Sequence, residues 1–479
     1  MTATADTDLA FAGPGALAQM VRAGEVHPRE LVELYLRRIE ALDPQLNAFR
    51  TTLPEQALAE AVSAAGRDGP LAGVPVAVKD DLPLAGHVAT KGSRSFGPPA
   101  AADAEAVRRL RAAGAIPIGI TNGPELMIFP WTATTANGVT RNPWNPARTP
   151  GGSSGGSASA VAAGLVAAAT ASDGGGSIRI PSACCGLVGM KSTRGRVSSQ
   201  PGGAGWLGLS VYGGLARSVA DSALMLDAMH GALAADASPL APFAGRYVDA
   251  AARDPGKLRI AISRKLPPGV LAKVSGEQRG AWERTGARLS ALGHEVVEAA
   301  PAYGRAQLEF IQTWLRGIYE ESLRVPDRSK LEPSTRQMAA AGRYLVPPAR
   351  RAQLLAHRSA TTARLMALWD EVDVLLTPAT ATTAIAADGG YGRPAPIAVN
   401  VAARFTPFTA LFNLTGQPAV TLPAGMGDDG LPLSVQLVGR IGAEDVLYSL
   451  AGQIESAAPW ADRRPRLADP GPPRGETVR

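Results

Sequence analysis

The sequence predicts an α/β layered fold, because segments with the pattern of strands alternate with segments with the pattern of helices over most of the chain. No period of roughly 20–50 residues recurs, which excludes a solenoid. The composition, with 46% hydrophobic and 19% charged residues, is that of a globular protein and excludes intrinsic disorder. No long linker divides the chain into separate domains.

The first part of the chain is predicted to be helical. Apolar residues recur there at helical spacing, and three helices are expected, at residues 16–23, 29–42 and 54–65. Residues 1–65 are therefore expected to form an N-terminal helical region.

The central part of the fold begins with a strand predicted at residues 74–79, because valine alternates with other residues at positions 74, 76 and 78. A helix is predicted at residues 104–113, because a glycine ends its apolar pattern. A short buried strand follows at residues 116–120.

Small residues dominate residues 149–172, which carry no charge. Glycine and serine predict a loop at residues 149–156, and alanine predicts a helix at residues 158–169. Leu165 is the only leucine, isoleucine or phenylalanine of this stretch, so a membrane span is not expected. A second glycine loop is predicted at residues 174–176.

Strands and helices alternate again further along the chain. After a helix at residues 219–230, the pattern predicts a strand at 258–263, a helix at 276–292 and a strand at 295–297. Residues 300–365 are more helical and richer in arginine, and they are expected to be an insertion over the core.

The C-terminal part contributes the last predicted strands. A buried strand is expected at residues 372–376, and a strand pair at 419–422 and 433–438 with a glycine-aspartate turn at 427–430. Residues 461–479 are rich in arginine, proline and glycine and are predicted to be a surface tail.

Charge and cysteine content exclude several classes of protein. The net charge of +6 comes from scattered residues without a basic block, so no nucleic-acid or membrane partner is expected. Cys184 and Cys185 are adjacent and do not easily bridge, and two thiols alone do not make a zinc site. The absence of a disulfide framework and of a signal-peptide pattern predicts a cytoplasmic protein. No metal is expected, since two thiols are too few for a zinc site.

Two glycine-rich motifs do not fit the functions usually associated with them. Residues 203–208 match G-x-G-x-x-G, but no strand precedes them and no helix follows, so a plain loop is predicted. Residues 151–156 contain the G-x-S-x-G of a nucleophile elbow, but upstream prolines exclude the strand that an elbow requires. The downstream histidines are interpreted as structural, which leaves histidine-based serine chemistry poorly supported: His230, His294 and His357.

A third glycine cluster offers a different chemistry. Consecutive glycines at 174–176 allow backbone N–H groups to converge on an anion, and Ser177 stands at the end of this nest. The alternative is a tight turn before a buried segment. A lysine can deprotonate such a serine if burial keeps it neutral, and Lys79 ends a predicted core strand. A surface lysine after a strand is the ordinary alternative.

Lys79, the G-G-S-S-G-G run at residues 151–156 and the G-G-G-S-I-R run ending at Arg179 together resemble the amidase signature family of serine hydrolases. Ser153 and Ser177 have the separation expected for that family. The resemblance extends over nearly the whole chain, at residues 121–125, 141–145, 185–191, 215–221, 413–419 and 431–436.

The resemblance implies a fold and a division of the chain. It implies one domain over residues 1–479, an α/β/α layered fold around a large mixed β-sheet. The catalytic residues would lie in the core at residues 66–230, and the helical insertion at residues 300–365 would cover the active site.

The resemblance also implies catalytic roles. Ser177 would be the nucleophile, Ser153, after a cis peptide bond, would relay the proton, and Lys79 would be the general base. The oxyanion hole would come from a set of backbone N–H groups whose actual donors are left open: Gly174, Gly175, Gly176 and Ser177. Supporting roles fall to Ser154, Asp173 and Arg179.

The substrate-binding residues are less well determined. An apolar wall for the acyl group is implied for Met127, Ile128 and Phe129, followed by Trp131, although core packing explains these residues equally well. The candidates in the covering segment are unranked: Trp314, Tyr319 and Tyr344.

Some positions depart from the family pattern. Ser192, Thr193 and Arg194 stand where proline and often tyrosine precede Gly-Arg, and Gly174 stands where threonine is commoner. Arg194 and residues 141–145 are similar to bacterial amidases related to nylon-oligomer cyclic-dimer hydrolases.

The expected activity is hydrolysis of carboxylic amides, with aryl amides, esters and carbamates as further substrates, and with no cofactor. The alternative is the glutamine-hydrolysing subunit of a tRNA-dependent amidotransferase, although residues 208–214 differ from the sequence that is common there. A catalytically inactive scaffold is the third class, and a homodimer is an open alternative for the assembly.

Overall fold

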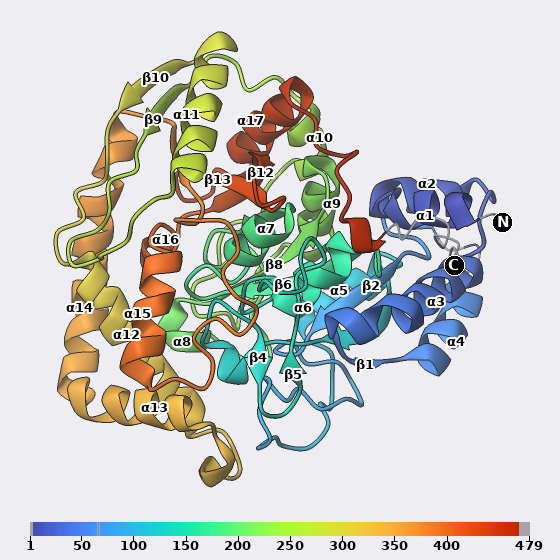
Figure 1. The fold of residues 1–479 in the computed structure, drawn as a ribbon, viewed down its shortest axis with the longest axis horizontal. Helices are drawn as coiled ribbons and strands as arrows, with labels where there is room; N and C mark the ends of the chain where they lie inside the picture. Colours follow the sequence, from blue (N-terminus) through green and yellow to red (C-terminus); the bar gives the residue numbers. More distant parts are fainter. Residues whose placement is uncertain (1–2, 65, 67, 469–479) are drawn as a thin grey trace, which may run out of the picture.

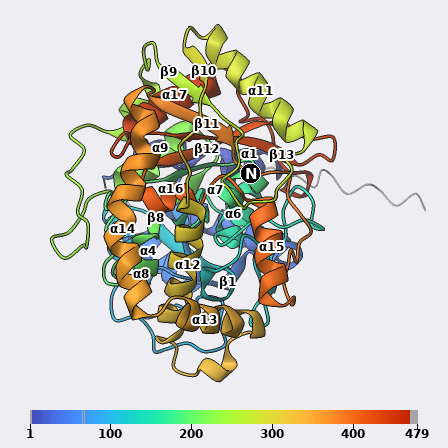
Figure 2. The ribbon, with the colours of Figure 1, turned by 90° about the vertical axis from the view of Figure 1, so that its left-hand side faces the viewer.

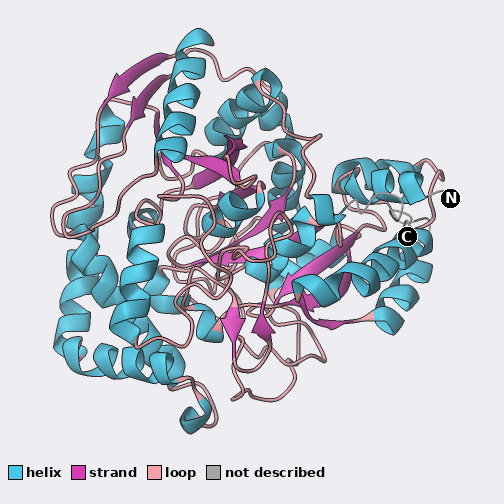
Figure 3. Cartoon of the chain, in the orientation of Figure 1, coloured by secondary structure: helices cyan, strands magenta, loops and turns pink. Residues whose placement is uncertain are grey.

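The computed structural model describes residues 3–64, 66 and 68–468. An eleven-stranded mixed β-sheet runs through it, in the order β1-β3-β2-β6-β8-β7-β12-β13-β11-β9-β10 (Figures 1 and 3). The predicted α/β fold around a large mixed sheet is therefore confirmed. The strands of this sheet are β1 (Phe49–Thr52), β2 (Pro75–Lys79), β3 (Ile116–Thr121), β6 (Ala168–Asp173), β7 (Val188–Lys191), β8 (Val211–Ala216), β9 (Arg259–Ile262), β10 (Glu295–Glu298), β11 (Val374–Pro378), β12 (Ala419–Met426) and β13 (Pro432–Val438). A separate two-stranded ribbon consists of β4 (Ala133–Thr134) and β5 (Gly138–Val139).

Parallel and antiparallel pairs occupy different parts of the sheet. Strand β2 is parallel to both of its neighbours, β3 and β6, and β9 is parallel to β10 and β11. The strands between these groups pair antiparallel. All residues of β2, β3 and β6 are buried, as expected for parallel strands covered on both faces.

Helices cover the sheet in two groups. The first group contacts the strands through three helices, α6 (Gly155–Ala162), α7 (Arg179–Cys185) and α11 (Gly276–Ala291). The second group contacts them through α9 (Val219–Met229) and α17 (Glu444–Ala457), and α10 (Tyr247–Ala252) packs against these two helices. The remaining helices of the first half are α1 (Ala3–Phe11), α2 (Pro14–Arg22), α3 (Pro28–Leu46), α4 (Pro54–Ala64), α5 (Glu105–Ala112), η1 (Glu125–Met127) and α8 (Gly205–Gly208).

The segment at residues 300–365, predicted as a helical insertion, consists largely of helices. It forms α12 (Ala306–Ser322), η2 (Arg328–Lys330), α13 (Pro333–Leu345) and most of α14 (Pro348–Met366). These helices lie along one side of the molecule, at the left of Figure 1 and facing the viewer in Figure 2. The other helices of the second half are η3 (Ala367–Asp370), α15 (Ala395–Phe405), α16 (Leu411–Thr415) and η4 (Arg466–Ala468).

The helix predicted at residues 158–169 is wrong in its second half. Helix α6 ends at Ala162, and residues 168–173 form β6 in the middle of the sheet. Alanine favours a helix when only local propensity acts, but strand pairing on both sides overrides that preference here. The sequence prediction also omitted several elements: β1, β7, β8, α7 and α10.

The two ends of the chain were predicted to be a helical region and a surface tail. The N-terminal region is helical apart from β1, and the helix predicted at residues 54–65 is α4, with residue 65 outside the described residues. Residues 469–479 of the predicted tail also lie outside them. Among the described residues, no helix is both long and apolar enough to cross a membrane.

Candidate active site

Lys79 ends β2 and is fully buried. Its backbone N–H donates to Thr170 Oγ1 of β6 at 2.8 Å, which fixes the strand end against its neighbour. The valines of β2 lie in the core, and the lysine lies at the carboxyl end of the strand, next to the loops that follow the strands.

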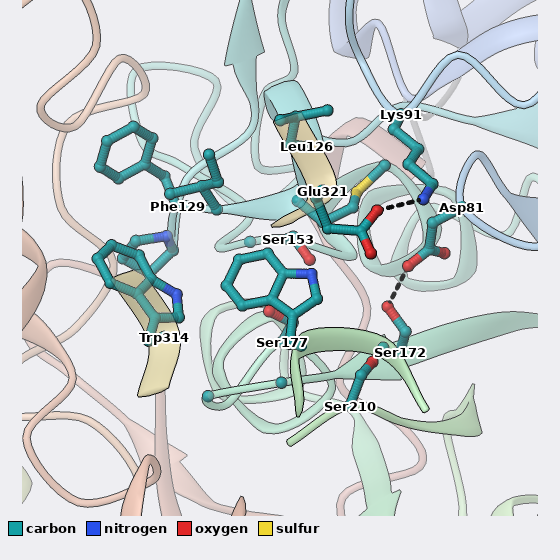
Figure 4. A pocket seen from close by; sticks show the side chains of 18 of the residues that line it. Asp81, Lys91, Leu126, Phe129, Ser153, Ser172, Ser177, Ser210, Trp314 and Glu321 are labelled. Carbon is teal, nitrogen blue, oxygen red and sulfur yellow. Dashed lines mark hydrogen bonds and ion pairs between the residues drawn. The ribbon is translucent and has the colours of Figure 1, made fainter. Parts of the chain in front are cut away.

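The Lys79 amine lies in a hydrogen-bond network. Nζ donates to Ser153 Oγ at 2.8 Å and to Ser172 Oγ at 2.6 Å. Ser172 Oγ in turn donates to Asp81 Oδ2 at 2.5 Å, and Asp81 Oδ2 lies 3.5 Å from Nζ (Figure 4). The lysine is therefore held by two hydroxyls and faces one carboxylate.

Burial lowers the pKa of Lys79, because the charged ammonium loses its hydration inside the protein. The carboxylates of Asp81, Asp173 and Asp80 act in the opposite direction without cancelling this effect. The site therefore favours the neutral amine more than water does.

Ser153 follows a cis peptide bond between Gly152 and Ser153, as the family resemblance implied. A Cβ on Gly152 would lie within 2.6 Å of backbone atoms of Phe129 and Trp131, so only glycine fits at this position. The backbone N–H of the next residue, Ser154, donates to the carbonyl of Ser177 at 3.3 Å. The two serine loops are thus tied together at the backbone.

Ser177 lies in the turn between β6 and α7 and is half-buried. Among the described residues its hydroxyl has no hydrogen-bond partner, and it faces the same cavity as Ser153 (Figure 4). In the predicted relay, Lys79 is therefore hydrogen-bonded to Ser153, whereas the described residues show no hydrogen bond between Ser153 and Ser177.

The predicted oxyanion donors are not equivalent. The Gly176 N–H donates to Asp173 Oδ1 at 2.7 Å, so it is already engaged. Within the described part of the chain, the N–H groups of Gly174, Gly175 and Ser177 have no acceptor. These three remain available to an oxyanion.

A buried ion pair supports the turn that carries Ser177. Arg179 donates from Nε and Nη2 to the two carboxylate oxygens of Asp173, each at 2.9 Å, and both side chains are fully buried. Burial alone would raise the pKa of Asp173, but the Arg179 guanidinium outweighs it and holds that pKa well below its usual range. Asn413 also donates to the Asp173 carboxylate, at 2.8 Å.

The cavity above the serines has a largely apolar wall. The residues predicted for this wall, Met127, Ile128 and Phe129, line it, and helix α12 adds others, of which Trp314 and Phe310 are the largest (Figure 4). Trp131 does not line the cavity, because it is fully buried and stacks on Phe129.

Two candidates from the covering segment do not reach the cavity. Neither Tyr319 nor Tyr344 belongs to its lining, and Tyr344 is 72% exposed. Tyr344 lies in α13, which packs against α12 rather than against the cavity.

The opposite side of the cavity is polar and was not predicted. It carries Asp81, Ser172 and Tyr212, and a pair between Lys91 Nζ and Glu321 Oε2 at 3.0 Å. Period-2 alternation is the signal that could have found Ser172, since it stands two residues from Thr170 on β6, whereas Asp81 lies in the turn after β2.

Other predicted residues lie as follows. Ser154 is buried, and its hydroxyl donates to the Ser172 carbonyl at 3.3 Å. The run at residues 203–208, predicted as a plain loop, contains the four-residue α8 and lines part of the cavity. The three downstream histidines do not line the cavity.

No group of three or more histidine, cysteine, aspartate or glutamate side chains that could hold a metal ion occurs among the described residues. Cys184 and Cys185 are free and buried. Burial raises the pKa of both thiols.

Comparison with known proteins shows the family. The amidase family model matches residues 30–447. AmiB2 of Mycobacterium tuberculosis, named as a candidate amidase, is 46% identical over 468 residues, which cover 96% of this chain and 99% of the relative. The 6-aminohexanoate-cyclic-dimer hydrolase of a Pseudomonas species is 35% identical over 492 residues, with 95% and 96% covered.

Solved structures agree with the sequence relatives. A 6-aminohexanoate cyclic dimer hydrolase complexed with substrate superposes with a TM-score of 0.88 at 33% identity, covering 96% of this chain and 99% of the other. A bacterial aryl acylamidase of the amidase signature family superposes with a TM-score of 0.83 at 26% identity, covering 95% and 97%. This protein is therefore a member of the amidase signature family of hydrolases, as its serine loops and strand-end lysine predicted.

Proposed function

We propose that this chain hydrolyses carboxylic amides through an acyl-enzyme on Ser177, with Ser153 and Lys79 as the proton relay. The observation that carries the proposal is the contact of a buried lysine amine, whose pKa is lowered, with Ser153 in the cavity that also holds Ser177. A neutral amine accepts a proton, whereas an ammonium cannot.

The first half of the reaction forms an ester. The Ser177 oxygen attacks the amide carbonyl carbon, its proton passes to Ser153, and the Ser153 proton passes to Lys79. The negative charge on the carbonyl oxygen is accepted by the free N–H groups of Gly174, Gly175 and Ser177. The carbon–nitrogen bond then breaks, and the proton held by Lys79 returns through Ser153 to the leaving amine.

The second half releases the acid. Water attacks the ester carbonyl, the same relay takes its proton, and Ser177 leaves with a proton returned from Lys79. The missing hydrogen bond between Ser153 and Ser177 agrees with this scheme, since catalytic hydrogen bonds often tighten only when substrate binds.

The lining of the cavity supports an apolar acyl or aryl group on the substrate. Met127, Phe129, Phe310 and Trp314 present carbon surfaces beside the two serines. The structural relatives are named for a cyclic amide dimer and for aryl acylamides, and both substrate classes are proposed for this chain together with esters and carbamates.

The glutamine-hydrolysing subunit is the alternative function. The relatives reported above do not favour it, because they carry amidase and cyclic-dimer hydrolase names. The purified chain is expected to hydrolyse simple amides without tRNA or partner chains. An absolute requirement for partner chains would favour the alternative.

The direct test is covalent labelling. A fluorophosphonate is expected to label the wild-type chain on Ser177 and to abolish amide hydrolysis, while Ser177→Ala takes up no label. Ser182→Ala is the matched control, because Ser182 lies on α7 with its hydroxyl bonded to the Ile178 carbonyl and should not affect labelling at Ser177. Labelling of Ser177→Ala to the wild-type extent would contradict the proposal.

A further inference from the structure

A second cavity adjoins the catalytic one. It measures about 750 Å³, and its walls come from the loop before α8, from α8 itself, and from α12 and α14. Trp206, Glu321 and Arg324 line both cavities. Nothing in the proposed reaction uses this second space.

Four arginines line the second cavity, and two of them are paired. Arg324 donates to Glu321 Oε1 at 2.9 Å, and Arg351 to Glu320 Oε1 at 2.8 Å. The other two, Arg194 and Arg358, form no ion pair with any described residue. The lining therefore has two uncompensated positive charges.

Arg194 and Arg358 also have unused hydrogen-bond donors. The Nε of Arg194 and both Nε and Nη2 of Arg358 are buried without a partner among the described residues. Unsatisfied buried donors are costly, and guanidinium donors more so than neutral ones. These three donor nitrogens are therefore expected to have an acceptor when the protein is in solution.

The two guanidinium groups converge on one place. The point where a Cβ on Gly208 would stand lies 3.5 Å from Arg358 Nη1, which donates to the Leu207 carbonyl, and 3.8 Å from the unused Arg194 Nε. Gly208 has a φ of 80° and presents no side chain, so the space between the two arginines stays open.

The electrostatics agree with this geometry. Burial, and then the charge of Arg358, lower the pKa of Arg194 to about 10. Burial also lowers the pKa of Arg358, which the carboxylate of Glu309 only partly offsets. Glu309 does not form an ion pair with Arg358, since its carboxylate accepts a hydrogen bond from the Thr361 hydroxyl instead.

We propose that Arg194 and Arg358 form a binding site for a small oxyanion, a carboxylate or a phosphate, beside the catalytic cavity. A planar guanidinium matches two oxygens of such a group, and a second guanidinium raises the affinity by charge. The anion would supply acceptors to the three unused donor nitrogens and offset the repulsion between the like charges.

The oxyanion site is connected to the catalytic loop through Arg194. Arg194 Nη2 donates to the carbonyls of Asn413, at 2.5 Å, and Leu414, at 3.0 Å, while Asn413 Nδ2 bonds the Asp173 carboxylate. Trp206 lines both the second cavity and the catalytic one. Two sources supply such an anion, the distal carboxylate of a substrate and a free ion.

Calorimetric titration tests the site without needing catalysis, so its result is independent of the Ser177 test. Inorganic phosphate, at an ionic strength held constant with sodium chloride, is expected to bind the wild-type chain saturably at one site. Arg358→Gln is expected to raise the dissociation constant for phosphate by about tenfold or more, because a charge-assisted bidentate contact is lost.

Two further variants make the test specific. Arg351→Gln removes the same charge from the same helix and cavity, but from an arginine that is already paired, so binding should change by less than about threefold. Arg194→Gln, checked for folding by circular dichroism, should weaken binding as Arg358→Gln does. Absence of saturable binding to the wild type, or equal losses in Arg351→Gln and Arg358→Gln, would overturn the proposal.

Kinetics then identify the source of the anion. If Arg358→Gln raises KM for an amide that ends in a carboxylate but not for its methyl ester, and phosphate competes with the former, the site holds the substrate's own carboxylate. If both KM values are unchanged while phosphate still binds the wild type, the site holds a separate anion. Either result supports an oxyanion site.

Discussion

The amine of Lys79 can accept a proton only while it is uncharged, and its surroundings are built accordingly. It is fully buried, and its two hydrogen-bond partners are hydroxyls that accept from the amine. The Ser153 hydroxyl can in turn donate to the neutral amine, whereas the Ser172 proton goes to Asp81. Asp81 is the one carboxylate in ion-pair contact with it among the described residues, at 3.5 Å.

Removing this amine should abolish the proposed relay. Lys79→Ala is expected to lower kcat by about 10²–10⁴-fold, the usual contribution of a general base, with KM less affected. Lys79→Met, which fills the same space without an amine, should be equally inactive and serves as the control for cavity effects. Steady-state kinetics and far-UV circular dichroism would check both, and an active variant would refute the base assignment.

The same argument predicts a pH dependence. Since the pKa of Lys79 is lowered but the amine must be neutral to act, kcat/KM should fall as the pH decreases through that pKa and the amine becomes charged. Asp81 favours the charged form, so Asp81→Asn should move this acidic limb to lower pH.

A pH–rate profile measures that displacement. Glu321→Gln is the matched control, because Glu321 lines the same cavity but is paired with Lys91 and Arg324 and is not among the groups that raise the pKa of Lys79. A limb that stays in place in Asp81→Asn would argue against Lys79 as its origin.

The connection from β6 to α7 depends on the Asp173–Arg179 pair. Arg179 donates to four different residues, namely Asp173 in the connection itself and Thr409, Asn413 and Gln436 from elsewhere in the chain. The nucleophile turn is therefore held between the sheet and the C-terminal half.

Breaking this pair should be costly. Arg179→Met leaves the Asp173 carboxylate buried without its cation, and the free energy of unfolding is expected to fall by about 3–5 kcal/mol. Adding Asp173→Asn should recover part of that loss, because the uncompensated charge is removed. Urea denaturation compares the three proteins; equal stability of the single and double variants would contradict the electrostatic explanation.

One sheet joins the two halves of the molecule, which supports the proposal of a single domain. Strand β7 of the first half pairs with β12 of the second, with Lys191 opposite Ala419, and the Arg179 contacts cross the same boundary. Neither half can bury its sheet edge without the other.

Thermal unfolding should therefore be one transition. Circular dichroism at a far-UV wavelength and tryptophan fluorescence are expected to report the same midpoint, since tryptophans occur in both halves, from Trp131 to Trp460. Two separated midpoints would show that the halves unfold independently and would contradict a single domain.

Much of the candidate site could be predicted from local sequence. Lys79, Ser153 and Ser177 stand in short motifs with characteristic glycines, because a tight backbone approach requires particular residues next to the reacting groups. The valine alternation likewise predicted β2. These features depend on neighbours along the chain, which a sequence displays directly.

The remaining features depend on contacts between distant segments. The start of strand β6, Ala168 and Ala169, was included in a predicted helix because alanine has no local preference for a strand, and only pairing with β2 and β8 makes this segment a strand. Ser172 acquires its role from that strand, and Arg194 and Arg358 come together from positions 164 residues apart, which no local pattern encodes. The sequence by itself thus determined the family, the reacting side chains and the alternation of elements. Tertiary packing alone decided which carboxylates and arginines surround them, because burial and charge compensation are properties of the folded chain.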